Sequence, residues 1–184
     1  MTQMTEEFHV LKIVCERLEN AGIPFMLTGS IAANLYTVPR MTRDIDIVID
    51  VKPGELGRIC TLFQDDFYIE PDSVKEAIEK RGMFNMIHNE YVLKVDFIVR
   101  KDSPYREMEF QRRQTVTVEN IEIPVVSIED LIISKLFWAK ESLSEIQLRD
   151  IKNLLAGGQD MDMQYFEKWV QSLGLQDVYA KVNQ

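Results

Sequence analysis

The stretch that decides the fold is "LTGSIAANLYTVPRMTRDIDIVID", residues 27–50. A hydrophobic segment ends on Gly29 and Ser30, and Asp44 and Asp46 then alternate with isoleucines. Alternate side chains of a strand share a face, so both carboxylates point the same way while the isoleucines face a core. Carboxylates in such a run are costly unless something positive compensates them. The stretch therefore predicts a strand that presents two acids to a cation.

The chain as a whole has the composition of an ordinary globular protein. It has 184 residues, of which 46% are hydrophobic and 28% are charged, so we expect one compact unit with at most a small appendage. The net charge of -9 disfavours tight non-specific binding to DNA or to membranes. A local basic patch could still serve a nucleic-acid acceptor, and its candidates are Arg40, Arg43, Arg112 and Arg113.

The cysteines and the apolar runs bear on the cellular setting. Cys15 and Cys60 lie in apolar segments with neither metal-ligand nor disulfide-framework spacing, so we expect both to be reduced core residues. No apolar stretch approaches the length that a membrane span needs. A cytoplasmic protein without a membrane segment is the expectation.

Hydrophobic periodicity predicts a mixed α/β core over residues 1–126 and a helical portion over 127–184 that packs on it. In the helical portion, Ser127 and Asp130 have the spacing of a capping box. The predicted helices lie at about 8–18, 30–36, 54–65, 73–81, 127–140, 145–158 and 162–174. The predicted strands are 23–29 and 44–51, with hairpins over 83–100, turning at Asn89-Glu90, and over 114–126, turning at Glu119-Asn120.

A third acid strengthens the prediction of a metal site. Asp96 interrupts "VLKVDFIVR", a run apolar enough to be a central strand. If that strand lies beside the one carrying Asp44 and Asp46, the three acids cluster on one sheet face and suffice for two metal ions. Hard oxygen ligands favour Mg²⁺ or Mn²⁺, which keep room for substrate phosphates.

Gly29 and Ser30 supply the other half of the predicted site. A strand that ends in "TGS" at the start of a helix offers a tight turn, a hydroxyl and free backbone N–H groups. These groups suit an anionic phosphate chain. The carboxylate face would then hold the metals, and the turn would hold a triphosphate.

The combination resembles the nucleotidyltransferase fold superfamily (polymerase-β-like). The resemblance rests on "GS" at 29–30, "DID" at 44–46 and the later strand acid in "VDF" at 95–97. Within that superfamily, "RMTRDID", "SIEDLIISKLFWAKES" and "LRDIKNLL" are similar to the bacterial minimal and AbiEii-like nucleotidyltransferases. The resemblance covers roughly residues 10–156 and implies a nucleotidyltransferase-like mixed sheet flanked by helices.

The resemblance also implies roles for individual residues. Gly29 and Ser30 would contact the phosphates of an NTP, Asp44 and Asp46 would bind both metal ions, and Asp96 would bind the catalytic one and favour deprotonation of the acceptor hydroxyl. Lys135 would contact the triphosphate. Apart from the resemblance, Arg40 and Arg43 flank the acidic site, where they could steer phosphate or only balance the charge of the acids. The implied reaction transfers a nucleoside monophosphate to an acceptor and releases pyrophosphate.

The acceptor and the biological partner stay open at this stage. Members of the resembled group modify tRNA, proteins or small molecules such as antibiotics, and some act as toxins or antitoxins of two-gene systems, with a partner from a neighbouring gene. The acidic surface favours a protein or small-molecule acceptor. Two rival functions are a glycosyltransferase that uses Asp-x-Asp with a nucleotide sugar, and a non-catalytic, antitoxin-like binding module of the same fold.

Four further expectations concern residues around the motifs. We expect Asp50 to cap the turn after its strand, Arg149 and Asp150 to serve a structural ion pair or N-cap, and Lys94 to balance the charge of Asp96. An aromatic cluster should form part of the helical core. Its members are Phe137, Trp138, Tyr165, Phe166 and Trp169.

Overall fold

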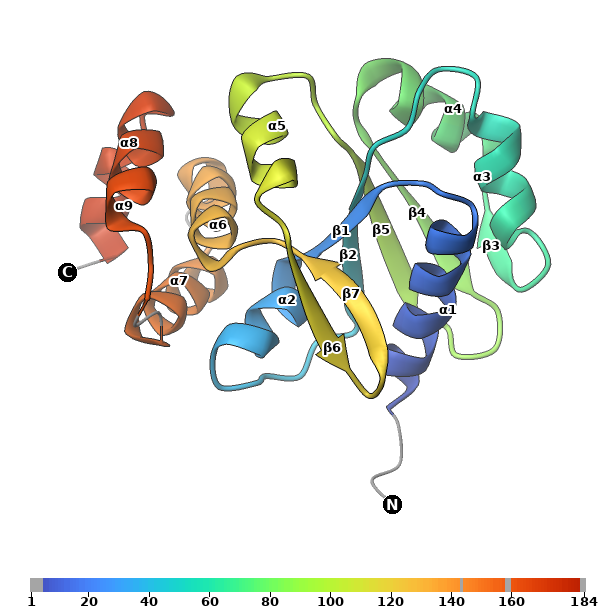
Figure 1. Ribbon diagram of the computed structural model, residues 1–184, viewed down its shortest axis with the longest axis horizontal. Coiled ribbons are helices and arrows are strands. Elements are labelled where there is room, and N and C mark those ends of the chain that lie inside the picture. Colours follow the sequence, from blue (N-terminus) through green and yellow to red (C-terminus); the bar gives the residue numbers. More distant parts are fainter. Residues whose placement is uncertain (1–4, 143, 158–159, 183–184) are drawn as a thin grey trace.

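The computed structural model describes residues 5–142, 144–157 and 160–182, and it confirms the α/β class. The described strands form one mixed sheet in the order β3-β4-β5-β2-β1-β7-β6 (Figure 1). β2 runs parallel to β5 and β1 runs parallel to β7, while all other neighbours are antiparallel. The strands are β1 Phe25–Thr28, β2 Asp44–Ile49, β3 Phe67–Ile69, β4 Met83–His88, β5 Lys94–Val99, β6 Gln114–Val118 and β7 Ile121–Val125.

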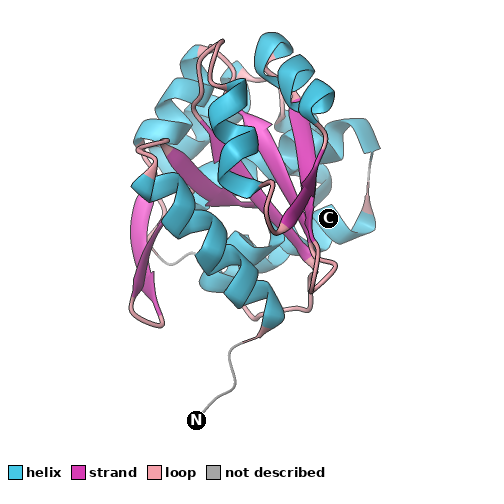
Figure 2. Ribbon diagram, turned by 90° about the vertical axis from the view of Figure 1, so that its right-hand side faces the viewer, coloured by secondary structure: helices cyan, strands magenta, loops and turns pink. Residues whose placement is uncertain are grey.

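Helices lie on both sides of the strands (Figure 2). Each predicted helix is present with shifted ends, because periodicity locates an apolar face better than it locates the caps. The helices are α1 Glu6–Asn20, α2 Gly29–Tyr36, α3 Leu56–Phe63, α4 Pro71–Lys80, α5 Pro104–Gln111, α6 Ile128–Ser142, α7 Glu145–Gly157, α8 Met163–Ser172 and α9 Gln176–Val182.

The central strand β2 has the two-faced character that its alternation predicts. Ile45, Ile47 and Ile49 are fully buried, whereas the side chain of Asp44 is 59% exposed. Burying three isoleucines contributes several kcal/mol at about 25 cal/mol per Å² of apolar surface. This face fixes the register of the strand, since a slip by one residue would bury the acids instead.

Both predicted hairpins are present. In the β6–β7 hairpin, Glu119 and Asn120 have φ values of 45° and 69°, as a two-residue turn with two left-handed positions requires. The β4–β5 hairpin differs from the prediction, because its connection is residues 89–93 rather than Asn89-Glu90 alone. Val92 takes a φ of 51° in this connection.

Three short elements were not predicted from the sequence. β3 has three residues and forms the edge of the sheet, and α9 has seven residues. α5 carried a readable start signal, because Ser103 caps it by accepting a hydrogen bond from the Arg106 N–H and Pro104 occupies its first turn. Its apolar periodicity was too weak to reveal it.

The helices after residue 127 gather beside the sheet, at the left of Figure 1. Val126 donates a backbone hydrogen bond to Leu27, which ties the end of β7 to β1 immediately before α6 begins. Ser127 accepts from the Asp130 N–H, as the predicted cap requires. The division at residue 126 stays a prediction.

The remaining whole-chain expectations concern cysteines and membranes. Cys15 and Cys60 are both free, and burial raises the pKa of the Cys15 thiol to about 12. Across the described ranges, no helix is both long enough and apolar enough to cross a membrane.

Candidate active site

The strand register brings the predicted acids together. Asp46 on β2 pairs with Asp96 on β5, although 50 residues separate them in the sequence. Next to β2, Thr28 of β1 pairs with Asp46, and on the far side of β5, Asn85 of β4 pairs with Asp96. The four side chains therefore form one row across the middle of the sheet.

Gly29 lies directly against Asp46. Its φ is 67°, and a Cβ built at this position would overlap the carboxylate of Asp46. The residue is therefore a glycine for two reasons, the left-handed backbone and the space that the carboxylate takes. The Gly-Ser turn and the Asp-x-Asp strand are parts of one packed arrangement.

The surroundings of Asp46 disfavour the charged form of its carboxyl group. Burial, together with repulsion from Asp96 and Asp44, raises the pKa of Asp46 to about 6. The ammonium groups of Lys135 and Lys94 oppose that shift. A carboxyl with a perturbed pKa in a cavity is a candidate functional residue, because binding sites concentrate uncompensated charge.

Lys94 places its ammonium among the acids. Its Nζ lies 2.7 Å from Asp96 Oδ2 and 3.6 Å from Asp44 Oδ1. The expected charge balance between Lys94 and Asp96 is therefore confirmed. In this arrangement no three His, Cys, Asp or Glu side chains of the described residues are grouped closely enough to hold a metal ion.

The donor set nevertheless fits a hard divalent cation. Asp44 and Asp46 alternate on one strand face, and Asp96 stands in register with Asp46. Carboxylate oxygens are the ligands that Mg²⁺ prefers. In this structure the Lys94 ammonium is the positive partner of Asp44 and Asp96. It would have to move away for these carboxylates to converge on a metal ion.

The start of α2 is built to receive an anion. α2 begins at Gly29, and Thr28 gives it no side-chain cap. Its first backbone N–H groups therefore carry the partial positive charge of a helix N-terminus. Arg40 Nη2 donates to Ser30 Oγ at 2.6 Å, which brings a guanidinium next to the same turn.

Asp150 holds two cations at this turn. Its carboxylate accepts from Arg40 Nε at 3.0 Å and from Lys135 Nζ at 2.9 Å, and it is almost fully buried. Burial alone would raise the pKa of Asp150, yet the hydrogen bonds from Arg40 and Lys135 hold it below its usual value. The ion pair expected for Asp150 is present, and its partners come from the loop before β2 and from α6.

The two basic residues singled out in the sequence lie differently. Lys135 is buried, faces the cavity described below and also contacts Gln147 Oε1 at 3.3 Å. Arg43 is exposed just before β2 and is not among the residues that line this cavity. Arg40, three residues earlier, is the arginine that contacts Ser30.

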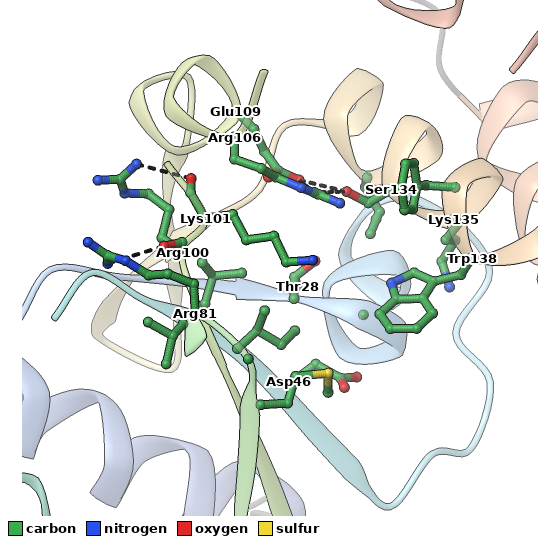
Figure 3. A pocket seen from close by; sticks show the side chains of 18 of the residues that line it. Thr28, Asp46, Arg81, Arg100, Lys101, Arg106, Glu109, Ser134, Lys135 and Trp138 are labelled. Atoms are coloured by element: carbon green, nitrogen blue, oxygen red, sulfur yellow. Dashed lines mark hydrogen bonds and ion pairs between the residues drawn. The ribbon is translucent and has the colours of Figure 1, made fainter. Parts of the chain in front are cut away.

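A cavity of about 620 Å³ opens over Thr28 and Asp46 (Figure 3). Its floor includes Asp46 and the Gly29-Ser30 turn, and its roof includes residues of α5 and α6. The volume lies in the range of small-molecule and cofactor sites. The contribution of α5 to the cavity was not predicted, because the weak apolar periodicity of this helix left it unrecognised.

A buried polar cluster forms part of that roof. Arg106 Nη1 lies 2.8 Å from both carboxylate oxygens of Glu109 and 2.7 Å from Ser134 Oγ. Ser134 Oγ in turn donates to Glu109 at 2.6 Å. Burial raises the pKa of Glu109, while Arg106 and Ser134 oppose the rise. The cluster joins α5 to α6 and shapes the cavity wall.

The aromatic prediction is wrong for two of its residues. Phe137 and Trp138 are 41% and 49% exposed and line the cavity, whereas Phe166 is fully buried in the core. Helical spacing placed Phe137 and Trp138 on the same helix, α6. It could not tell which side of α6 faces the other helices and which faces the cavity.

Two further expectations are corrected by the contacts. Asp50 does not cap its turn but pairs with Arg100 Nε at 3.2 Å, and Glu55 accepts from the Lys52 N–H in its place. Arg112 is not part of an open basic patch. It bridges Glu129 and Asp130 at 3.3 Å each, which uses its charge inside the structure.

Comparison with protein families gives a match over most of the chain. The model of the family described as "Nucleotidyl transferase AbiEii toxin, Type IV TA system" matches residues 15–151. This range includes the Gly-Ser turn, the three acids and Asp150. A search of curated protein sequences found no match.

Solved structures share the fold at low sequence identity. The lincosamide antibiotic adenylyltransferase LnuA, bound to lincomycin, is 20% identical, with a TM-score of 0.57 over 82% of this chain and 96% of its own. The antibiotic-resistance factor ANT(2'')-Ia is 11% identical, with a TM-score of 0.55 over 95% and 94%. An antigenic nucleotidyltransferase-like protein from Paracoccidioides brasiliensis is 17% identical, with a TM-score of 0.59 over 95% and 91%.

Proposed function

Because the chain belongs to the AbiEii nucleotidyl transferase family, we propose that it transfers a nucleoside monophosphate from an NTP to an acceptor hydroxyl. The observation that carries this proposal is the register of Asp46 with Asp96 beside the Gly29-Ser30 turn, with Asp46 and the turn both lining the cavity. Acids and anion-binding groups side by side are what the transfer of a phosphoryl group needs, since positioning and charge neutralisation supply most of its acceleration.

The acids are the proposed metal ligands. Asp44 and Asp46 would hold two Mg²⁺ or Mn²⁺ ions, and Asp96 would share the one nearest the acceptor. When bound, the metals neutralise the phosphate oxygens and lower the pKa of the attacking hydroxyl. The high pKa of Asp46 supports this assignment, because a divalent cation would relieve the repulsion that raises it.

The turn and the nearby cations are the proposed triphosphate site. Backbone N–H groups of Gly29 and Ser30 would donate to the phosphates, and Lys135 would neutralise their charge. Arg40 supports this arrangement, because it reaches Ser30 directly. Arg43 keeps its proposed role of steering the nucleotide towards the site from the exposed loop.

Asp96 is the proposed proton acceptor. The acceptor oxygen forms a bond to the α-phosphorus, and the bond from that phosphorus to the bridging oxygen of pyrophosphate breaks. The hydroxyl proton passes to Asp96, and pyrophosphate leaves with the bonding electrons. The side chain of Asp96 is 15% exposed and stands in register with Asp46, which lines the cavity.

The family description supports a role in a toxin–antitoxin system with a partner protein. We propose that this chain acts in the cytoplasm, where NTPs are available, and that the product of a neighbouring gene counteracts or restrains it. One observation favours a second candidate, a non-catalytic antitoxin-like module. Lys94 already supplies a cation to Asp44 and Asp96, as it would in a site that never binds a metal.

Labelling separates these two candidates. The protein is incubated with NTPs labelled at the α-phosphate, Mg²⁺ and a cell lysate, and labelled RNA, protein and small molecules are resolved. We expect label that disappears in Asp46→Asn and persists in the matched variant Asp65→Asn, which removes an equal charge from an exposed turn. If no NTP leaves label in any fraction, and Asp46→Asn keeps the biological effect, the non-catalytic module is the correct function.

A further inference from the structure

The cavity extends from Asp46 in two opposite directions. The Gly29-Ser30 turn follows Thr28, which pairs with Asp46, so it lies towards the N-terminal end of β2. In the other direction the floor continues through Val48 and Ile98 to the C-terminal end of β5. Each direction defines an arm of the cavity, here called the turn arm and the β5 arm.

The β5 arm ends in a group of cations. Arg81, Arg100 and Lys101 all line it, in a chain whose net charge is -9. The two arginines are used in the structure, because Arg81 lies 2.9 Å from Asp102 and Arg100 lies 3.5 Å from the same carboxylate. Their charge is therefore compensated before any ligand arrives.

Lys101 is different from these arginines. Within the described ranges its ammonium makes no hydrogen bond and no ion pair, although Asp102 is the next residue. Figure 3 shows its side chain extending from the end of β5 into the cavity rather than away from it. A lysine without a protein partner that points into a cavity supplies a positive charge for a ligand.

We propose that the β5 arm binds the acceptor and that Lys101 holds an anionic group on it, most simply a phosphate. The proposal rests on the function proposed above. In an in-line displacement the attacking and leaving oxygens lie on opposite sides of the α-phosphorus. With pyrophosphate leaving on the turn arm, the acceptor hydroxyl must approach from the β5 arm.

The charge of Lys101 then restricts the class of acceptor. A hydroxyl compound that bears a phosphate a few bonds away would fit, whether it is a sugar phosphate or the 3' end of an RNA strand. A polycation such as an aminoglycoside would meet Lys101 unfavourably at the same place. Among the acceptors that the sequence leaves open, this favours those that carry a phosphate.

Calorimetry on the full chain tests the proposal. The turn arm is first saturated with Mg²⁺ and α,β-methylene ATP, which cannot transfer its nucleotide. Ribose 5-phosphate, ribose, an RNA dinucleotide with a free 3' hydroxyl and tobramycin are then titrated separately. We expect ribose 5-phosphate, the dinucleotide or both to bind, and ribose and tobramycin to bind far more weakly.

Variants assign the effect to Lys101. Lys101→Met should weaken binding of the phosphate probe by about tenfold, the usual value of one charge-assisted contact. It should leave binding of the ATP analogue within about twofold, because the contact is made only by the acceptor. Lys75→Met removes an equal charge from the exposed face of α4 and should change neither affinity.

Several results would overturn the proposal. Equal binding of ribose and ribose 5-phosphate, or tight binding of tobramycin, would show that the arm does not select a phosphate. A Lys101→Met variant that loses affinity for the ATP analogue alone would place Lys101 in the turn arm. If the wild-type protein binds no ATP analogue at all, the proposed function fails together with this inference.

Discussion

Gly29 and Asp46 occupy adjoining space so closely that no side chain fits at position 29. The Asp46 carboxylate lies where a Cβ of residue 29 would be, and the backbone of Gly29 is left-handed. The phosphate-binding turn and the metal-binding strand proposed here therefore depend on each other sterically. A change in either one displaces the other.

Gly29→Ala should abolish nucleotidyl transfer and lower the free energy of unfolding by about 2 to 4 kcal/mol, from backbone strain and overlap together. Gly22→Ala is the matched control, because Gly22 has a similar φ of 63° but nothing within 4 Å of the added Cβ. It should cost about 1 kcal/mol and keep full activity. Urea denaturation and the labelling assay measure both effects, and equal losses in the two variants would contradict the steric argument.

Asp46→Asn should stabilise the metal-free protein while removing its activity. The folded-state pKa of Asp46 is about 6, above its ordinary value of 3.8, so folding favours the protonated form. The contribution of Asp46 to the free energy of unfolding of the wild type should therefore be most favourable below pH 4. That contribution should be lost as the pH rises from 4 to 6.

Asparagine does not ionise, so Asp46→Asn avoids that loss. Its free energy of unfolding should exceed that of the wild type by about 2 kcal/mol at pH 7.5 and match it more closely near pH 4. Thermal denaturation in EDTA at both pH values measures the difference. A variant no more stable than wild type at pH 7.5 would mean that the Asp46 carboxylate is better compensated than its surroundings indicate.

Lys94→Met should tighten the binding of Mn²⁺ by about tenfold, because the ammonium no longer competes for Asp44 and Asp96. It should also destabilise the metal-free protein, since three carboxylates lose a counter-ion. Electron paramagnetic resonance of free Mn²⁺ gives the affinity directly. Lys94→Arg keeps the charge and should stay near wild type, whereas an unchanged affinity in Lys94→Met would mean that the ammonium does not compete.

Asp150→Asn should lower the affinity for NTP and destabilise the fold by about 3 kcal/mol, because Lys135 and Arg40 lose a buried partner. Asp150 is a positioning residue, because it acts by holding Arg40 and Lys135 in place. Ions in solution cannot hold these side chains in place, so high salt should not restore the affinity of Asp150→Asn for the nucleotide. Fluorescence titration with a labelled ATP and urea denaturation measure the two effects. Asp65→Asn, at an exposed turn, should change neither of them.

The sequence predicted the motifs of the site better than their surroundings. Strict alternation identified the strand of Asp46, because a residue that faces a core must be apolar. The acid in the strand of Asp96 was recognisable for the same reason. Their adjacency could only be a hypothesis, since no local pattern states which strands pair, and the structure confirms it.

The parts that could not be predicted are those set by long-range contacts. Lys94 was recognised only as a balancing charge, whereas its ammonium lies between acids from two strands. Glu109 and Arg106 were missed because their importance comes from Ser134 on another helix. Trp138 was assigned to a core because helical spacing shows a face without showing what covers it.

The pairing of β2 with β5 also has a consequence for the timing of folding. The two strands are parallel, and β3, β4, α3 and α4 must all be made before the second strand exists. Parallel pairing at such a separation has a high contact order and forms slowly. Lys135 and Asp150 are synthesised later still. A chain on the ribosome therefore carries no assembled site until most of it has emerged.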